Sequence, residues 1–228
     1  MNPMEPSTPS KTSRLVADDE GDSGSHEFSI ASSETIYVGK ILALRGDEVR
    51  MPGGGTARRE VVEHFGAVAV VALDDDGRIV LIYQYRHPYG RRLWELPAGL
   101  LDAGGEAPHV SAARELVEEV GLAAQTWRTL VDLDSAPGFC DESVRVFLAT
   151  GLSEVDRPEA HDEEADLTVR RFDLADAVAK VYAGDIVNSI AVAGILAAHA
   201  MPDVEALRPV DAPWVDRPTA FARRMGHL

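Results

Sequence analysis

Alternation of polar and apolar residues predicts several strands along the chain. Residues 58–65 alternate as a strand buried on one face does, whereas residues 66–73 are almost continuously apolar and are typical of a strand buried on both faces. Residues 79–85 and 143–150 carry the same β-type pattern. Residues 74–77, Asp-Asp-Asp-Gly, favour a hairpin turn between the second and third of these strands.

A helical repeat replaces the strand pattern in three segments. The first lies between Pro108, which is suited to the start of a helix, and Gly121, which is suited to its end. The second covers residues 174–182. The third covers residues 186–200, with Asp185 as the expected capping residue, and its nearly continuous apolar surface predicts burial against a sheet or a partner.

The helix expected between Pro108 and Gly121 has two unlike faces. One broad apolar face contains Val110, Ala113, Leu116, Val117 and Val120. The opposite face gathers Glu115, Glu118 and Glu119. These acids repel one another, and Arg114 offsets only part of the repulsion. Such a cluster most often faces water, but a hard divalent cation such as Mg²⁺ is the alternative partner.

The two ends of the chain have a different composition from its middle. Residues 1–27 are rich in Ser, Pro, Gly and acidic residues and are expected to be disordered. Residues 35–38 and 41–44 are short β-type runs set off by Gly39 and Gly46, which indicates a meander of strands. The last 25 residues are punctuated by prolines, so we expect an extended tail.

Composition excludes several classes of protein. A net charge of −16 over 228 residues argues against a nucleic-acid binder, and the single cysteine, Cys140, excludes an internal disulfide framework. The longest apolar run, residues 190–198, is too short to cross a bilayer, and no leader peptide is recognisable, so we expect a cytoplasmic protein without membrane association. No second metal-type residue is spaced to join His64, which favours a packed or hydrogen-bonded strand residue.

The acidic helix resembles the Nudix box. Seven residues separate Glu106 from a run that reads Arg-Glu-Leu-Val-Glu-Glu-Val-Gly-Leu, residues 114–122, and this matches the box completely. One departure lies upstream: Gly99 stands seven positions before Glu106, whereas the box has six, and the extra residue falls in the loop of residues 102–105.

The resemblance implies a fold and a division of the chain. The fold class would be α/β, an α/β/α sandwich around a mixed β-sheet, with a small N-terminal antiparallel β-domain. The expected segments are a disordered extension (1–27), a β-domain used for dimerisation (28–62), a Nudix hydrolase domain (63–203) and the extended tail (204–228).

Two further motifs resemble the ADP-ribose pyrophosphatase branch of this family. Gln-Tyr-Arg at residues 84–86 is followed by Trp-Glu-Leu-Pro-Ala-Gly at residues 94–99, and Pro137 stands sixteen residues after Gly121. The implied reaction is hydrolysis of ADP-ribose to AMP and ribose 5-phosphate. Alternatives are a Nudix enzyme for diadenosine polyphosphates or nucleotide sugars, and a catalytically silent regulator that senses ADP-ribose.

The resemblance also assigns the metal site. Two or more Mg²⁺ or Mn²⁺ ions would be held by Glu115 and Glu119, with Glu118, the carbonyl of Ala98 and Glu164 as further ligands. Water would be activated by Glu164 or its neighbour Glu163, both in the acidic stretch of residues 159–166.

Three residues are expected to bind substrate. Arg86 is suited to a phosphate by its two-pronged donor geometry, although a surface arginine is an equal reading from position alone. By resemblance, the backbone near Leu100 also contacts substrate, and Arg59 would be donated by the second subunit of a homodimer. The acidic net charge and the missing DNA-binding module speak against the regulator.

Overall fold

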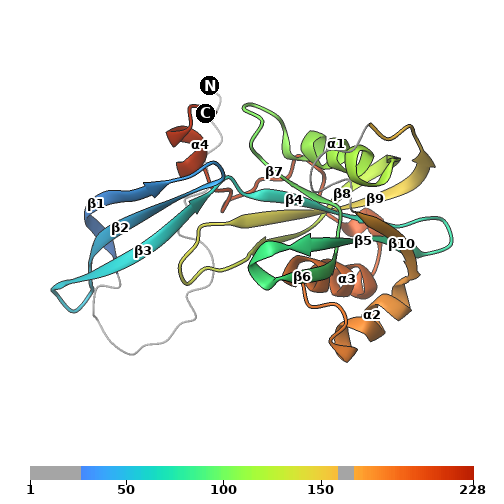
Figure 1. Cartoon of the computed structure of the whole chain (residues 1–228), viewed down its shortest axis with the longest axis horizontal. Coiled ribbons are helices and arrows are strands. Elements are labelled where there is room, and N and C mark those ends of the chain that lie inside the picture. The colour runs from blue at the N-terminus through green and yellow to red at the C-terminus, as the bar shows by residue number, and fades with distance from the viewer. Residues whose placement is uncertain (1–26, 159–166) are drawn as a thin grey trace, which may run out of the picture.

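The computed structural model describes residues 27–158 and 167–228, which fold into three β-sheets and flanking helices (Figure 1). The strands are β1 (Ser29–Val38), β2 (Leu42–Arg50), β3 (Thr56–His64), β4 (Ala67–Ala72), β5 (Arg78–Arg86), β6 (Arg91–Glu95), β7 (Ala98–Leu100), β8 (Leu122–Asp134), β9 (Ser143–Glu154) and β10 (Thr168–Asp173). The helices are α1 (Pro108–Val120), α2 (Leu174–Ala183), α3 (Ser189–Ala200) and α4 (Ala220–Arg224), with 3-10 turns η1 (His87–Tyr89) and η3 (Val204–Ala206).

Two sheets form the middle layer of the molecule. The first has the order β7-β4-β9-β8 and is mixed, because β4 runs parallel to β9 while the other neighbours are antiparallel. The second has the order β10-β5-β6 and is antiparallel throughout. Helix α1 lies on one side of this layer, and α2 and α3 lie on the other (Figure 1). This is the predicted α/β/α sandwich around a mixed sheet.

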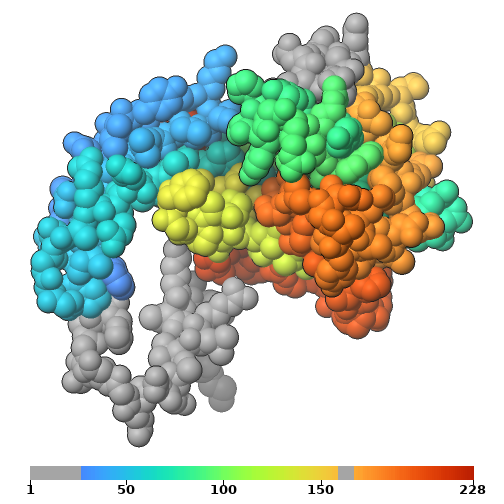
Figure 2. All heavy atoms as spheres, turned by 60° about the horizontal axis from the view of Figure 1, so that its bottom comes forward, coloured from blue at the N-terminus to red at the C-terminus, as the bar shows by residue number. Residues whose placement is uncertain are grey.

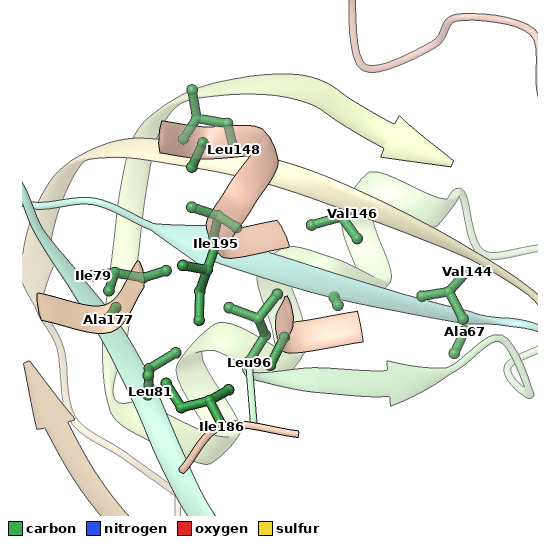
Figure 3. Packing of buried hydrophobic residues seen from close by; sticks show 14 residues of the cluster. Ala67, Ile79, Leu81, Leu96, Val144, Val146, Leu148, Ala177, Ile186 and Ile195 are labelled. Atoms are coloured by element: carbon green, nitrogen blue, oxygen red, sulfur yellow. The ribbon is translucent and has the colours of Figure 1, made fainter. Parts of the chain in front are cut away.

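Strand β4 joins the two halves of the core. Its odd-numbered residues pack in the cluster that contains α3, and its even-numbered residues pack in the cluster that contains α1. Successive strand side chains point to opposite faces, so a strand covered on both sides must be apolar throughout, as predicted for residues 66–73. Figure 3 shows the α3 side, where Ile195 lies among Ile79, Leu96 and Leu148. Helix α3 approaches closely, since a Cβ at Gly194 would lie 2.6 Å from Leu96 Cδ1.

The N-terminal sheet, β1-β2-β3, lies at one end of the molecule (blue and cyan in Figure 2). Its strands are longer than the short runs predicted for residues 35–38 and 41–44. Gly46 does not interrupt β2: it pairs with Glu60 of β3, and a Cβ there would overlap the guanidinium of Arg58. Every residue of β1 is exposed.

Two boundaries differ from the sequence prediction. Helix α3 begins at Ser189, because the side chain of Asn188 accepts a hydrogen bond from the Ala191 N–H at 2.9 Å and acts as the cap. Asp185, the predicted cap, instead lies 3.5 Å from the Lys180 ammonium. The tail was expected to be extended, but it contains η3 and α4. The boundaries of the four segments, 1–27, 28–62, 63–203 and 204–228, remain predictions.

The thirteen-residue strand β8 was not predicted. Most of its residues are half-buried rather than alternately buried and exposed, so the sequence lacks the period of two that reveals a strand. None of the helices in the described residues is long and apolar enough to cross a membrane.

Candidate active site

Helix α1 begins and ends at the residues that the sequence indicated. Pro108 occupies its first turn, and Gly121 follows its end in the left-handed conformation at φ 67°, donating its N–H to the Val117 carbonyl at 3.0 Å. The buried face is rotated from the predicted one. It contains Ser111, Ala112, Leu116 and Glu119, whereas Val110 is 45% exposed.

This rotation turns Glu115 and Glu119 toward β7 rather than toward water. Glu119 is only 6% exposed, and its Oε2 accepts a hydrogen bond from the Ala98 N–H at 2.9 Å. The carboxylate of Glu115 lies against Gly99, where a Cβ would overlap it. The solvated acidic face, which is the usual alternative for such a cluster, does not hold for Glu115 and Glu119, and glycine at position 99 makes room for a carboxylate.

Arg114 forms hydrogen bonds with three acids of the box. Its guanidinium donates to Glu106 at 3.2 Å, to Glu115 at 2.9 Å and to Glu118 at 2.8 Å. Burial disfavours its charge, but these hydrogen bonds and charges outweigh burial and raise the pKa of Arg114 above its ordinary value. Hydrogen bonds from Ser111 and then Arg114 lower the pKa of Glu106. Arg114 thus holds three glutamates of the box in place and offsets part of their mutual repulsion, as expected.

The donor set at this point has the chemistry of a hard-cation site. Glu115, Glu118, Glu119 and the backbone of Ala98 supply only oxygen ligands, which Mg²⁺ and Mn²⁺ prefer. The space that Gly99 leaves for the Glu115 carboxylate supports the same assignment. Within residues 27–158 and 167–228 no three His, Cys, Asp or Glu side chains are already arranged to hold a metal ion. Arg114 pairs with Glu115 and Glu118 instead.

Arg86 stands at the end of β5 in a two-point ion pair. Its Nε and Nη2 donate to the two carboxylate oxygens of Glu95 at 2.9 and 2.7 Å. Glu95, on the neighbouring strand β6, is 3% exposed, whereas the Arg86 side chain is 39% exposed. A buried carboxylate therefore fixes the guanidinium while leaving part of it open to solvent. Sequence reasoning missed Glu95; its place in the Trp-Glu-Leu-Pro-Ala-Gly motif was the available signal.

A cavity of about 470 Å³ brings together three residues of the predicted site. Arg86, Ala98 and Leu100 all line it. His64 and Glu142 line it as well, with His64 Nδ1 3.3 Å from Glu142 Oε1. His64 was expected to be a packed or hydrogen-bonded strand residue, and it ends β3 and accepts a hydrogen bond from the Gly66 N–H at 3.2 Å. Glu142 was not singled out. The signal for Glu142 was its position five residues after Pro137.

Arg59 lies elsewhere in a single copy of the chain. It lines a second cavity of about 570 Å³, whose wall also contains Pro137, Phe139 and Glu142. Its guanidinium donates to the Arg58 carbonyl at 2.9 Å. Glu142 lies between the two cavities, since it lines both. Glu163 and Glu164, the expected water-activating residues, lie outside the described residues.

Comparison with known proteins agrees with this geometry. An ADP-ribose pyrophosphatase of Mycobacterium tuberculosis (strain ATCC 25618 / H37Rv) is 66% identical over 200 residues, covering 87% of this chain and 97% of that protein. An ADP-ribose pyrophosphatase of Bacillus subtilis (strain 168) is 38% identical over 158 residues, covering 69% and 85%. A crystal structure of an ADP compounds hydrolase shares the fold, with a TM-score of 0.65 at 22% identity over 76% of this chain and 92% of that one.

The family model for the NUDIX domain matches residues 63–189, more than half of the chain. That span contains the acidic helix, β7, the Arg86–Glu95 pair and most of the first cavity. The chain belongs to the NUDIX family of hydrolases.

Proposed function

We propose that this enzyme hydrolyses the diphosphate of ADP-ribose, giving AMP and ribose 5-phosphate. One observation carries the proposal: a single cavity joins the partly exposed guanidinium of Arg86 to Ala98 and Leu100 of β7, the strand against which the helix acids pack. A diphosphate needs a cationic contact and a site for divalent cations side by side. The names of the relatives from M. tuberculosis and B. subtilis specify the substrate.

Each predicted group has a distinct role in this proposal. Arg86 binds two oxygens of a phosphate, while Glu95 fixes the plane of the Arg86 guanidinium. The backbone at Leu100 lines the same cavity. Glu115, Glu118, Glu119, Glu164 and the Ala98 carbonyl would hold Mg²⁺ or Mn²⁺, two or more ions. When bound, such ions neutralise phosphate oxygens and lower the pKa of water. Arg114 keeps the glutamates apart and aligned.

A substrate panel tests the proposal. Diphosphate cleavage would be assayed with Mg²⁺ or Mn²⁺ on ADP-ribose, NADH, diadenosine polyphosphates and nucleotide sugars. We expect the highest kcat/KM on ADP-ribose, with AMP and ribose 5-phosphate as products. A higher kcat/KM on a diadenosine polyphosphate or a nucleotide sugar would reassign the substrate, and tight binding of ADP-ribose without cleavage would indicate a sensor.

Glu164, with Glu163 as the second choice, is proposed to take the proton from the attacking water. Glu164→Gln should lower kcat more than it changes KM, because the loss falls on the transition state. Glu163→Gln is the matched comparison. A change in KM alone would make Glu164 a binding residue, and a larger loss of kcat in Glu163→Gln would exchange the two roles.

We also propose that the enzyme is a homodimer that places Arg59 at the partner's substrate site. Strand β1 supports this, because its exposed residues include Ile30, Ile36, Tyr37 and Val38, an apolar edge that a partner would cover. Light scattering should give the mass of two chains. A fully active monomer would contradict the dimer, and an unchanged KM in Arg59→Ala would remove Arg59 from the site.

The remaining proposals concern location and other partners. The enzyme is proposed to be cytoplasmic and to act on a small molecule. The net charge of −16 supports the proposal that it does not bind nucleic acid.

A further inference from the structure

The last eleven residues pack into the corner between the N-terminal sheet and the NUDIX domain. Phe221 of α4 is fully buried, and its ring meets Phe65 edge-on, with centroids 4.5 Å apart. The ring of His227 stacks on Phe65 at 5.3 Å, and Arg224 donates to both oxygens of Glu63 at 2.8 and 3.1 Å. Phe65 follows β3 directly, so the C-terminus is anchored where the chain passes from one sheet to the next.

The same segment touches the loop that precedes α1. A Cβ at Gly104 would lie 3.2 Å from the carbonyl oxygen of His227 and 3.4 Å from its Cα, so the two backbones are close to contact. Gly104 belongs to the loop of residues 102–105, which is one residue longer than the Nudix box has it. The longer loop therefore meets the chain's own C-terminus.

A short series of contacts connects this loop with the acids of α1. Glu106 follows it and donates its N–H back to the Ala103 carbonyl at 3.2 Å. The Glu106 carboxylate accepts from Arg114, whose guanidinium also donates to Glu115 and Glu118. A displacement of the loop would therefore move Glu106, then Arg114, and then the carboxylates proposed to hold the cation.

We infer that the C-terminal segment, residues 218–228, positions the loop of residues 102–105 and thereby the metal-binding carboxylates of α1, with His227 as the positioning residue. The inference rests on the proposed use of a divalent cation by these carboxylates. It gives a role to the extra residue in the loop: the added length brings Gly104 against His227.

Paired glycine substitutions test the contact. Gly104→Val adds a side chain that meets His227, whereas Gly53→Val is a matched control, because nothing lies within 4 Å of a Cβ there. Binding of Mn²⁺ to the substrate-free protein would be measured by titration calorimetry. We expect Gly104→Val to weaken it about tenfold, the low end of what loss of a partner that orients metal ligands costs. Gly53→Val should leave it unchanged. Equal affinities for Gly104→Val and wild type would overturn the inference.

Removal of His227 and Leu228 supplies the second arm. Phe221 and Arg224 remain, so the segment keeps its anchors, and the melting temperature checks the fold. The truncation alone should weaken Mn²⁺ binding, and adding Gly104→Val should weaken it no further, because the side chain then has nothing to meet. The inference would be contradicted if the truncated chain bound Mn²⁺ as tightly as wild type. It would also be contradicted if the truncation and Gly104→Val weakened Mn²⁺ binding additively. If the truncated chain does not fold, the comparison of Gly104→Val with Gly53→Val decides the inference.

The experiment separates this inference from the proposed function. A wild-type protein that binds Mn²⁺ but does not cleave ADP-ribose would end the proposed function, while the comparison of variants would still decide the inference. Cleavage of ADP-ribose by wild type with equal Mn²⁺ affinity in every variant would end the inference alone. Failure of wild type to bind Mn²⁺ would end both.

Discussion

Glu119 combines a negative charge with almost complete burial, and its described partner is the backbone of Ala98. Taking a carboxylate out of water costs several kcal/mol unless other groups compensate for the loss of hydration. The Ala98 N–H contributes to that compensation, and a divalent cation bound at the same carboxylate would add to it. Glu119 is the strongest single candidate for a metal ligand, because it is the most buried acid of the box and lies against β7.

Glu119→Gln should lower kcat on ADP-ribose by more than about a hundredfold, since it removes a charge from the metal site while keeping an oxygen for the Ala98 N–H. The melting temperature should stay the same or rise, because a neutral amide is easier to bury. Steady-state kinetics and thermal unfolding measure the two effects. Glu205→Gln, at a side chain that is 75% exposed, is the control and should match wild type. Near-normal turnover in Glu119→Gln would remove this residue from the site.

Arg86→Lys should raise KM for ADP-ribose by about tenfold with a smaller effect on kcat, because a lysine cannot pair with Glu95 and a phosphate through a fixed two-point geometry. The alternative is that Arg86 is a structural residue that serves only to pair with Glu95 and does not contact substrate. Initial-rate kinetics distinguish the two. Loss of stability with KM unchanged would make Arg86 a structural residue.

Helix α1 is held at its C-terminal end by more than its own capping glycine. The Nε of Arg157 donates to the Glu118 carbonyl at 2.6 Å, and the Val155 N–H donates to the Gly121 carbonyl at 3.0 Å. Carbonyls of a last helical turn lack partners within the helix, and a cation is favourable there. The segment that leaves β9 thus fixes the turn that carries Glu118 and Glu119.

Gly121→Ala should destabilise the protein by about 1–2 kcal/mol, because an L-residue is disfavoured at φ 67°. Gly184→Ala, after α2 at φ 80°, shares this backbone cost but has open space around its Cβ. A Cβ at Gly121 would lie 3.3 Å from the Val155 carbonyl oxygen, so its substitution should cost more. Urea unfolding of both variants measures the difference. Equal losses of unfolding free energy in the two variants would mean that the segment after β9 moves aside at little cost and does not fix the end of α1.

At the scale of the molecule, a buried charge cluster joins the N-terminal sheet to the C-terminus. Glu63 of β3 accepts from Arg45 of β2 at 2.7 Å and from Arg224 of α4 at 2.8 Å. Burial alone would raise the pKa of Glu63, but the hydrogen bonds from Arg224 and Arg45 outweigh it and hold the pKa below its ordinary value. The cluster therefore favours the folded state only while Glu63 is ionised.

Acid should weaken this junction. A carboxyl whose pKa is lower in the folded state adds stability that is fully present above its unfolded pKa, here 4.5, and is lost as the pH falls through the lower folded value. Glu63→Gln should therefore cost about 1–3 kcal/mol at neutral pH, and the cost should shrink as the pH falls below 4.5 and through the lower folded pKa of Glu63. Urea unfolding at a series of pH values measures both, with Glu48→Gln at an exposed pair as control. A loss independent of pH would exclude ionisation of Glu63 as the cause.

The sequence by itself determined the elements whose signals are local. Strand β4, the hairpin turn after it and the two ends of α1 follow from periodicity, Pro108 and Gly121, because these depend on neighbours within a few residues. The box spacing likewise singled out Glu115, Glu118 and Glu119. Half-buried β8 lacks a local period, and the cap of α3 depended on which of two nearby side chains reached a backbone N–H.

Only the tertiary structure decided which groups meet. The acids of α1 turn toward β7 because Ala98 and Glu119, 21 residues apart, are brought together by the packing of the helix on the sheet. Arg224 and Glu63 are 161 residues apart, and the contact of His227 with Gly104 also joins residues that are distant along the chain. No local pattern encodes such pairs, since they arise from burying several elements at once around a shared core.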